Sequence, residues 1–272
     1  MDKEYIFDTG SDLGREQMEY LADILDGPTT ESLEAIDVRP GQRCLDLGAG
    51  GGSITRWLAE RTGPTGAVVA VDLDTDCLVE QPGVEIHRHN VDDGLPSDGP
   101  YDLIHARLLL MHLSRREAIL KTLVDALAPG GWLVVGDISS RPLKVLSAPS
   151  RADEVLFDYV QDVSHNVVAR GRGVSFEWAH DVYGHMVDAG LTNVHGAEFS
   201  ETNVGGDDAC RLHRNYNLQA ESLLLDAGLS ADEIGRYRAL LLDPRFRVWY
   251  YQFVCTRGQK PASHLHPNID NL

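Results

Sequence analysis

Cysteine is scarce in this chain of 272 residues, which contains only four. Cys44, Cys77, Cys210 and Cys255 form no C-x-x-C pair and lie at none of the short spacings from histidine that zinc sites use. The pattern therefore predicts buried free thiols, as expected in a reducing cytoplasm.

Basic residues are few relative to acidic ones. Lys and Arg number 24 against 42 Asp and Glu, so the formal net charge is -18 and the pI is near 4.9. Because nucleic-acid binding depends largely on basic surface, this balance predicts that the chain binds no nucleic acid. A local basic patch remains compatible with it.

Long apolar runs are also absent. The start of the chain, residues 1–5, is charged and has no signal-peptide pattern, and no apolar run is long enough to cross a bilayer. We therefore expect a cytoplasmic protein without membrane contact. At 43% hydrophobic, the chain can bury one large core, and its polar end, residues 259–272, is expected to be loosely ordered.

The most informative stretch is residues 44–54, where an apolar run ends in four glycines and turns into a helical pattern. Gly48, Gly50 and Gly52 open backbone torsions closed to other residues and let a ligand approach the main chain, while Ser53 can cap the next helix. The carboxylate of Asp46 suggests that this loop holds something other than a pyrophosphate.

Strand and helix patterns alternate from residue 43 onward, which predicts a parallel sheet with helices on both faces. The predicted strands are 43–47, 67–71, 84–89, 101–106, 132–137, 193–199 and 248–255. The predicted helices are 53–61, 77–80, 114–126, 151–169 and 176–189. Before the sheet, Gly27-Pro28 is expected to separate two helices, the second ending near Asp37.

The ends of the second and third predicted strands carry side chains suited to a nucleoside. Asp72 lies beside the glycine loop, where a carboxylate can accept both hydroxyl protons of a ribose. After the third strand, Asn90 can offer an amide to an adenine edge, Val91 can cover the base, and Asp92 can accept from its amino group. The nearby pair His87 and His89 lacks a third ligand at suitable spacing, so no metal site is predicted.

Four features in order support a resemblance to a known family. They are the Asp46-to-Gly52 stretch, Asp72 ending the second strand, the Tyr101-to-Ile104 strand and Pro129-Gly130-Gly131 before the fifth strand. The chain resembles the class I S-adenosylmethionine-dependent methyltransferases, particularly the small-molecule branch of specialised metabolism. The match covers about residues 40–137, half of the chain.

The resemblance implies an α/β fold with a Rossmann-like, seven-stranded, mostly parallel sheet whose last strand is antiparallel between the fifth and sixth. It implies S-adenosyl-L-methionine as cofactor and S-adenosyl-L-homocysteine as product. Asp46 and the Gly48 backbone would hold the methionine amino group, which the carbonyl of Ala106 or Arg107 would also face. The cofactor-binding residues are predicted as Tyr5, Asp46, Gly48, Ala49, Gly50, Gly52, Ser53, Asp72, Leu73, Asn90, Val91, Asp92, Ala106, Arg107 and Met111.

Two alternatives stay open at this stage. A nicotinamide-dependent dehydrogenase would explain the near-match to G-x-G-x-x-G, but Ser53 stands at the third glycine position and Asp46 would repel a pyrophosphate. A relative that binds S-adenosylmethionine but catalyses another reaction, such as a rearrangement, is the second alternative, because fold does not determine function.

The substrate is expected at segments added to the core domain, residues 41–258. Residues 1–40 form a predicted helical lid, and insertions 138–175 and 200–244 form a predicted cap over the carboxyl ends of the strands. Aromatic residues of these segments suit a medium-sized, partly apolar acceptor, or simply form core. These aromatic residues are Phe157, Tyr159, Trp178 and Tyr216.

Methyl transfer is an in-line displacement, so the protein mainly positions the nucleophile and excludes water. If the acceptor needs a general base, His112 and His165 are the candidates by position and by an ordinary pKa near 6.5. A core or helix-capping role is the alternative for each. The sequence leaves open whether oxygen, nitrogen or carbon is methylated, and whether the chain forms a homodimer.

Overall fold

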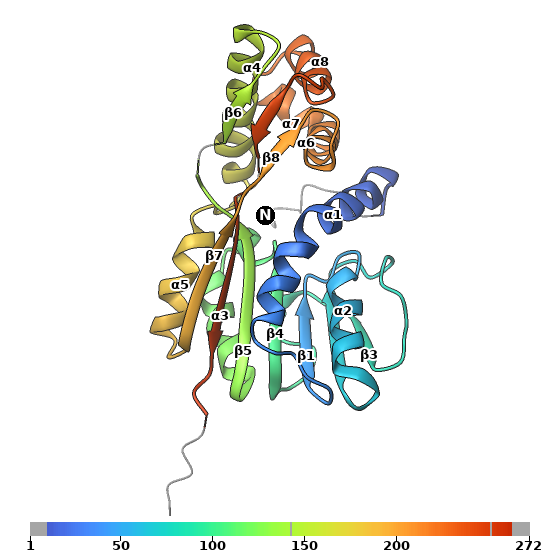
Figure 1. The fold of residues 1–272 in the computed structure, drawn as a ribbon, viewed down its shortest axis with the longest axis vertical. Coiled ribbons are helices and arrows are strands. Elements are labelled where there is room, and N and C mark those ends of the chain that lie inside the picture. The colour runs from blue at the N-terminus through green and yellow to red at the C-terminus, as the bar shows by residue number, and fades with distance from the viewer. Residues whose placement is uncertain (1–9, 142, 251, 263–272) are drawn as a thin grey trace, which may run out of the picture.

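The computed structural model describes residues 10–141, 143–250 and 252–262. Tyr5 and most of the predicted tail lie outside these residues. The main sheet has seven strands in the order β3-β2-β1-β4-β5-β10-β7, which is the predicted fold class (Figure 1). The strands are β1 Arg43–Leu47, β2 Ala67–Asp72, β3 Val84–Arg88, β4 Tyr101–Arg107, β5 Leu127–Ile138, β7 Thr192–Phe199 and β10 Phe253–Gln259.

Strands β3, β2, β1, β4 and β5 run parallel, and β10 lies antiparallel between β5 and β7, as predicted. The central strands are apolar and buried on both faces, which is typical of a parallel sheet covered by helices. The strand order reverses between β1 and β4. In such sheets the crevice at the carboxyl ends beside this reversal is the usual ligand site.

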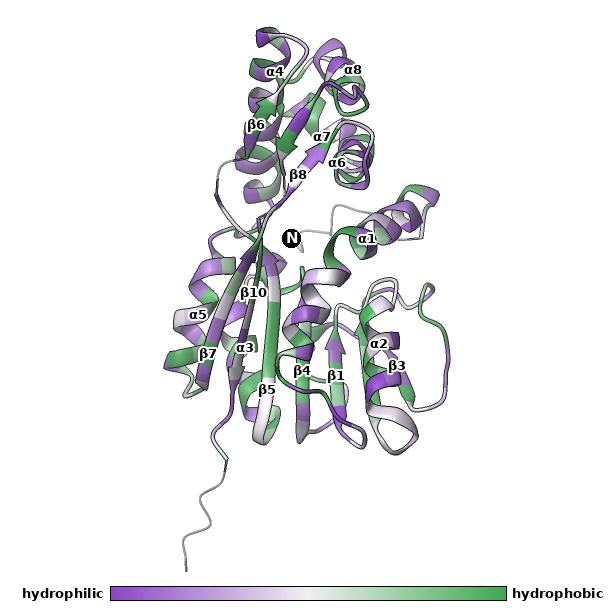
Figure 2. Ribbon diagram, in the orientation of Figure 1, coloured by the Kyte–Doolittle hydropathy of each residue, from purple (hydrophilic) through white to green (hydrophobic). Residues whose placement is uncertain are grey.

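Helices cover both faces of this sheet (Figure 1). Helices α1 (Asp12–Glu34) and α2 (Ser53–Thr62) pack on one face through a cluster that includes Leu33 and Leu58. Helices α3 (Arg116–Ala126) and α5 (Trp178–Asp188) pack on the other through a larger apolar cluster. Figure 2 shows the hydrophobic residues along β5, between these two helical layers.

Helix α1 is continuous, so the predicted break at Gly27-Pro28 is wrong. Proline removes one backbone donor, but two hydroxyls that follow it donate to carbonyls of the preceding turn. Thr29 Oγ1 lies 2.6 Å from the Leu25 carbonyl oxygen, and Thr30 Oγ1 lies 2.8 Å from that of Asp26. The tertiary contacts of Leu25 and Leu33, both buried, stabilise the helix on either side of the proline.

Three other predicted elements differ from the structure. Cys77 lies in a turn and residues 78–80 have no regular secondary structure, so no helix forms there. The predicted helix 151–169 is α-helical only as α4 (Arg151–Asp162) and continues as a π-helix, Val163–Ala169. The predicted strand 248–255 is divided, because its first residues form β9 (Arg247–Trp249) in a different sheet and only its end belongs to β10.

A second lobe, here called the cap, lies beyond the carboxyl edge of the main sheet (Figure 1). It contains a three-stranded sheet, β6-β9-β8, with β6 Lys144–Ser147 and β8 Thr202–Val204. Its helices are α4, α6 (Asp208–Gln219), α7 (Glu221–Asp226) and α8 (Ala231–Leu240). The cap has an apolar core of its own, centred on Phe157, Tyr237 and Phe246.

Short 3-10 helices complete the described chain at Gly63–Thr65, Val91–Asp93 and Leu110–His112. The thiols of Cys44, Cys210 and Cys255 are buried and free, as predicted, whereas Cys77 is partly exposed. Within the described residues, no helix combines the length and the apolar character that a membrane span requires.

Candidate active site

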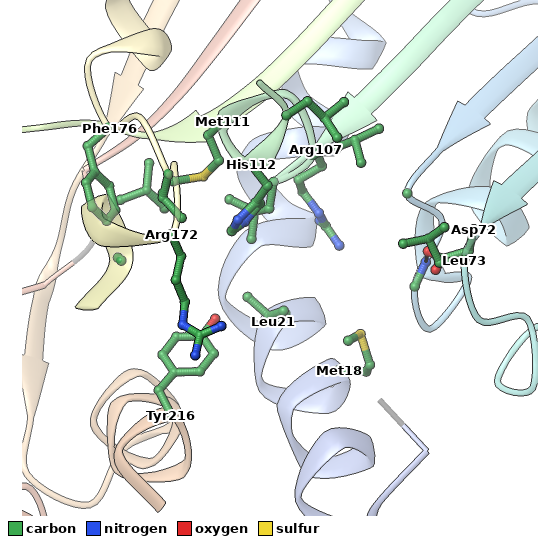
Figure 3. A pocket seen from close by; sticks show the side chains of 18 of the residues that line it. Met18, Leu21, Asp72, Leu73, Arg107, Met111, His112, Arg172, Phe176 and Tyr216 are labelled. Atoms are coloured by element: carbon green, nitrogen blue, oxygen red, sulfur yellow. Dashed lines mark hydrogen bonds between the residues drawn. The ribbon is translucent and has the colours of Figure 1, made fainter. Parts of the chain in front are cut away.

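A cavity of about 950 Å³ lies between the carboxyl edge of the main sheet and the cap. The glycine loop, the ends of β2 and β4, and helix α1 line one half of it, which we call the loop half. The π-helix and the cap helices line the other, which we call the cap half. Figure 3 shows Asp72 and Leu73 at one end and Arg172, Phe176 and Tyr216 at the other, with His112 and Arg107 between them.

The glycine loop has the geometry that its sequence predicts. Gly48, Gly50 and Gly52 have φ values of 68°, 52° and 73°, a region that side chains disfavour. Gly52 does not line the cavity: it is the N-cap of α2, and a Cβ there would lie 2.9 Å from Leu78. The predicted capping role of Ser53 is therefore wrong; its Oγ donates to Asp26 Oδ1 of α1 at 2.9 Å.

Asp72 lies at the cavity end of β2, beside the loop. Its Oδ2 accepts from the Gly50 N–H at 2.8 Å and its Oδ1 from the Asp74 N–H at 3.0 Å. Burial raises the pKa of this carboxyl above its usual range, and the backbone donors oppose that shift. The carboxylate thus fixes the loop while its remaining lone pairs face the cavity.

The segment after β3 also lines the cavity, through Asn90, Val91 and Asp92. Asn90 Oδ1 accepts from the Asp92 N–H at 3.0 Å, which closes a tight turn. Asp92 Oδ1 is buried and has no hydrogen-bond partner among the described residues. A buried oxygen of this kind costs free energy unless a ligand donates to it.

Asp46 is not among the residues that line the cavity. It is 1% exposed, and both of its oxygens have protein partners. Oδ1 lies 2.7 Å from His105 Nδ1, and Oδ2 accepts from Thr55 Oγ1 at 2.6 Å. The sequence interpretation missed His105 altogether. Ala106, 1% exposed, is also absent from the cavity wall.

The other predicted loop-half residues do line the cavity. They are Gly48, Ala49, Gly50, Ser53, Leu73, Arg107 and Met111. Arg107 is held by α1, because its Nη1 lies 2.8 Å from Asp26 Oδ1 and 3.2 Å from Thr29 Oγ1. Helix α1 also contributes Met18, Leu21 and Ala22 to the wall, which the sequence interpretation did not name.

Both histidines predicted as candidate bases line the cavity. Burial lowers the pKa of His112 to about 4, and the Arg116 charge lowers it further. Burial likewise lowers the pKa of His165 to about 4, with Arg170 adding to the effect and Asp162 opposing it. Both imidazoles are therefore uncharged at neutral pH and can accept a hydrogen bond.

The cap half contains polar and aromatic side chains that the sequence interpretation did not single out. Of the four aromatic residues named from sequence, Tyr216 lines the cavity, whereas Phe157 and Trp178 are core and Tyr159 is 42% exposed. The further lining residues of this half include Gln161, Ser164, Arg172, Phe176, His213, Asn217, Tyr237 and Tyr250. A polar residue on an amphipathic helix gives no sequence signal that distinguishes a cavity wall from solvent.

Comparison with known families decides what this arrangement belongs to. A family described as a methyltransferase domain matches residues 15–196, more than half of the chain. The chain belongs to this family. The predicted class I S-adenosylmethionine-dependent methyltransferase family is confirmed, and with it S-adenosylmethionine as the cofactor of that family. The family match gives no support to the dehydrogenase alternative.

Similar curated proteins match only part of the chain. Methyltransferase str2 of Strobilurus tenacellus is 34% identical over 110 residues, which cover 39% of either chain. The ubiquinone/menaquinone biosynthesis C-methyltransferase UbiE of Ectopseudomonas mendocina is 32% identical over 118 residues, covering 40% of this chain and 46% of that one. The matched region thus spans less than half the length of these relatives.

Solved structures resemble nearly the whole chain. A cyclopropane-fatty-acyl-phospholipid synthase-like protein from Lactobacillus casei aligns with a TM-score of 0.55 and 18% identity, over 93% of this chain and 94% of that one. Phosphoethanolamine N-methyltransferase 2 of Haemonchus contortus aligns with a TM-score of 0.56 and 14% identity, over 93% and 58%. At these identities the likeness shows the fold and gives no information on the acceptor.

Proposed function

We propose that the chain transfers the methyl group of S-adenosyl-L-methionine to a small, partly apolar organic acceptor and releases S-adenosyl-L-homocysteine. The observation that carries the proposal is the continuity of the cavity. It runs from the glycine loop and Asp72, suited to a nucleoside, to the cap half, where polar and aromatic side chains line the wall. A methyl donor and a methyl acceptor can therefore lie end to end in one cavity.

The loop half fits the adenosine part of the cofactor. Asp72 would accept from the ribose hydroxyls, as a carboxylate at the end of the second strand does in dinucleotide folds. Asp92 Oδ1, which has no partner among the described residues, would accept from the adenine amino group, while Val91 and Leu73 would cover the base. Gly48 and Gly50 lack side chains where the cofactor would pass closest to the backbone.

The methionine end would lie near Gly48, Arg107 and Met111. The Gly48 loop and the main-chain carbonyl of Arg107 would face the amino group. Asp46 would act from behind the wall, by fixing the strand end through His105 and Thr55. We therefore propose that Asp46 is a positioning residue, which holds the glycine loop in place and does not itself contact the ammonium group.

When bound, S-adenosylmethionine supplies a methyl group activated by the sulfonium. The chain has to hold the nucleophile in line with it and keep water out, and the apolar side chains that α1 and the cap contribute to the cavity wall favour both. His112 lies between the two halves of the cavity (Figure 3). We propose that it accepts the hydrogen bond of the acceptor and receives its proton during transfer. His165, on the cap side of the cavity, is the second candidate for this role.

A methyl-transfer assay tests the function. The purified chain is incubated with S-adenosylmethionine labelled in the methyl group and a library of small phenols, amines and activated methylenes, and products are identified by mass. Label in a product together with S-adenosylhomocysteine supports transfer. An altered acceptor without cofactor consumption would instead identify the non-methylating alternative, and no reaction with any nucleophile class would contradict the proposal.

Other predictions from the sequence remain predictions. They are the domain limits at residues 40 and 258, a cytoplasmic location, a role in specialised metabolism, the absence of a nucleic-acid partner and the open question of a homodimer.

A further inference from the structure

We infer that Gln161 and Asn217 form a polar recognition subsite in the cap half, which selects a planar aromatic acceptor without positive charge that carries both a hydrogen-bond donor and a hydrogen-bond acceptor. The inference rests on the proposed function, because it names the class of molecule that receives the methyl group. Both side chains line the cavity, and both are more than nine-tenths buried, at 7% and 5% exposure.

Asn217, on α6, has one end fixed and the other end unpaired. Its Oδ1 accepts from Arg238 Nε at 2.6 Å, and its carbonyl oxygen accepts from Arg238 Nη2 at 2.8 Å. Arg238 is itself held by Glu221 Oε2 at 2.8 Å. The oxygen is thus committed to the guanidinium, and the buried Nδ2 has no partner among the described residues. Nδ2 can therefore donate a hydrogen bond to an acceptor atom of a ligand.

In Gln161, on α4, the amide nitrogen is paired and, among the described residues, the amide oxygen is not, which is the reverse of Asn217. Its Nε2 donates to Tyr237 Oη and lies 3.5 Å from Tyr250 Oη, and the two hydroxyls are themselves 2.9 Å apart. Gln161 Oε1 is buried and has no partner within the described part of the chain. The tyrosines therefore orient the amide, and its oxygen is left to accept from a ligand.

These two groups are connected through α8. Tyr237 orients Gln161, and the next residue, Arg238, orients Asn217. One helix therefore fixes both amides, which makes the pair a preorganised feature of the cap and not two independent surface side chains. A buried donor and a buried acceptor without partners among the described residues raise the free energy of the folded chain. A ligand that forms hydrogen bonds with both lowers it again.

The surrounding wall is aromatic. The His213 ring is stacked on Tyr250, with centroids 3.5 Å apart and planes 13° apart. Tyr216 meets His213 edge-on at 5.9 Å, and Phe176 lies 4.9 Å from His165. Flat rings of this kind favour a planar aromatic ligand by stacking and edge contacts.

The electrostatics of the cap half disfavour a cationic acceptor. Among the described residues, the carboxylates that line the cavity belong to α1 and the loop half: Glu19, Asp72, Asp74 and Asp92. The cap half instead contains the cation Arg172 and two histidines, His165 and His213. Burial lowers the pKa of His213 well below its ordinary value, as it does for His112 and His165, so the three rings are uncharged at neutral pH.

The π-helix contributes to the same wall. Its residues Ser164, His165, Val168 and Ala169 all line the cavity. A π-helical turn carries an extra residue relative to an α-helix, and such turns are frequent at functional sites. Here the π-helix begins at Val163, two residues after Gln161, so the amide and His165 reach one cavity from consecutive turns.

Binding to the chain saturated with S-adenosylhomocysteine tests the subsite without requiring turnover. Calorimetry compares four probes: 3-hydroxy-2-naphthamide, its N,N-dimethyl derivative, which keeps the phenolic O–H but lacks the amide N–H donors, the anion 3-hydroxy-2-naphthoate, and the cation 3-(aminomethyl)-2-naphthol. We expect the primary amide to bind at least tenfold more tightly than each of the other three. The cation should be the weakest, because no carboxylate of the described residues faces it in the cap half.

Two variants assign this preference to the named atoms. Gln161→Leu should reduce the advantage of the primary amide over the N,N-dimethyl amide to less than threefold. Asn217→Asp keeps the oxygen that Arg238 requires but removes the donor, and should weaken the primary amide about tenfold. Asn203→Leu, which changes a 6% exposed cap residue outside the cavity, is the matched control and should leave all four affinities unchanged.

The outcomes separate the subsite from the function. If S-adenosylhomocysteine binds but the four probes bind equally, or the variants keep the wild-type preference, the subsite is wrong and the methyltransferase proposal stands. If the wild-type chain does not bind S-adenosylhomocysteine, both proposals are wrong. Retained S-adenosylhomocysteine binding in every variant shows that each one is folded.

Discussion

His105 Nδ1 lies 2.7 Å from Asp46 Oδ1, and the side chains are 3% and 2% exposed. The two residues are direct register partners in the parallel pairing of β1 with β4. The contact is therefore a consequence of strand register at the point where the sheet order reverses. Thr55, on the first turn of α2, occupies the second oxygen of Asp46. This buried network holds the two ends of the glycine loop together.

Replacement of Asp46 by Ala should destabilise the chain as well as weaken cofactor binding. Removing one partner of a buried polar pair costs about 3–5 kcal/mol, whereas Asp46→Asn can keep hydrogen bonds to both neighbours and should cost less. Urea unfolding measures the difference, with the exposed Asp125→Ala as control. An Asp46→Ala chain of full stability that has lost only its cofactor affinity would support direct contact with the ligand instead.

Asp92 should recognise the adenine amino group. The wild-type chain is expected to bind S-adenosylhomocysteine at least tenfold more tightly than S-inosylhomocysteine, which lacks that donor, because a buried unpaired oxygen discriminates strongly against its absence. Asp92→Ala should reduce the preference to about twofold. Competition binding measures the affinity for both ligands. An unchanged preference in the variant would show that another group binds the adenine amino group.

His112 should affect turnover and leave cofactor binding intact. With an acceptor identified by the transfer assay, His112→Gln is expected to lower kcat about 100-fold, in the range that a positioned base contributes, with the affinity for S-adenosylhomocysteine unchanged. The exposed His180→Gln is the control. Equal losses of kcat and of cofactor affinity would mean that His112 supports the fold of the cavity and takes no part in transfer.

Acidification should destabilise the fold between pH 6.5 and pH 4. The pKa of His112 and of His165 is lowered to about 4 in the folded chain, so the unfolded chain binds more protons throughout this interval. Stability is therefore lost as the pH falls, by up to about 1.4 kcal/mol per pH unit for each histidine. The free energy of unfolding, measured with urea at several pH values in this range, should depend less steeply on pH in His165→Gln than in the wild type. Identical pH dependence in both chains would contradict the burial of His165.

Local patterns predicted the strands of the sheet well, for an identifiable reason. Strands β1 and β2 are short apolar runs buried on both faces, so burial and sequence coincide. The prediction of one strand from Val248 to Cys255 was wrong because the buried residues of this run belong to different elements. Val248 lies in the cap sheet, Tyr250 in the connecting chain and Phe253 in β10. A continuous run of apolar residues in the sequence does not reveal a change of sheet.

The site was predictable to the extent that it is local in sequence. The glycine loop and Asp72 lie within one β-α-β unit, so spacing alone brought them together. Gln161 and Asn217 come from helices far apart in the chain and are positioned by α8, which no pattern indicated. For Asp46, spacing along the chain could not reveal its partner, because His105 reaches it through strand pairing.

Calorimetric titration with S-adenosylhomocysteine, S-adenosylmethionine and NAD, on the wild-type chain and on Asp72→Asn, tests the central claim most directly. We expect one site for each sulfur ligand, no binding of NAD, and at least a 30-fold loss of affinity in Asp72→Asn, where one of the two charged oxygens that would face the ribose is replaced. Asp76→Asn, on the same loop but outside the cavity, should bind as the wild type does. NAD binding without S-adenosylhomocysteine binding would contradict the account.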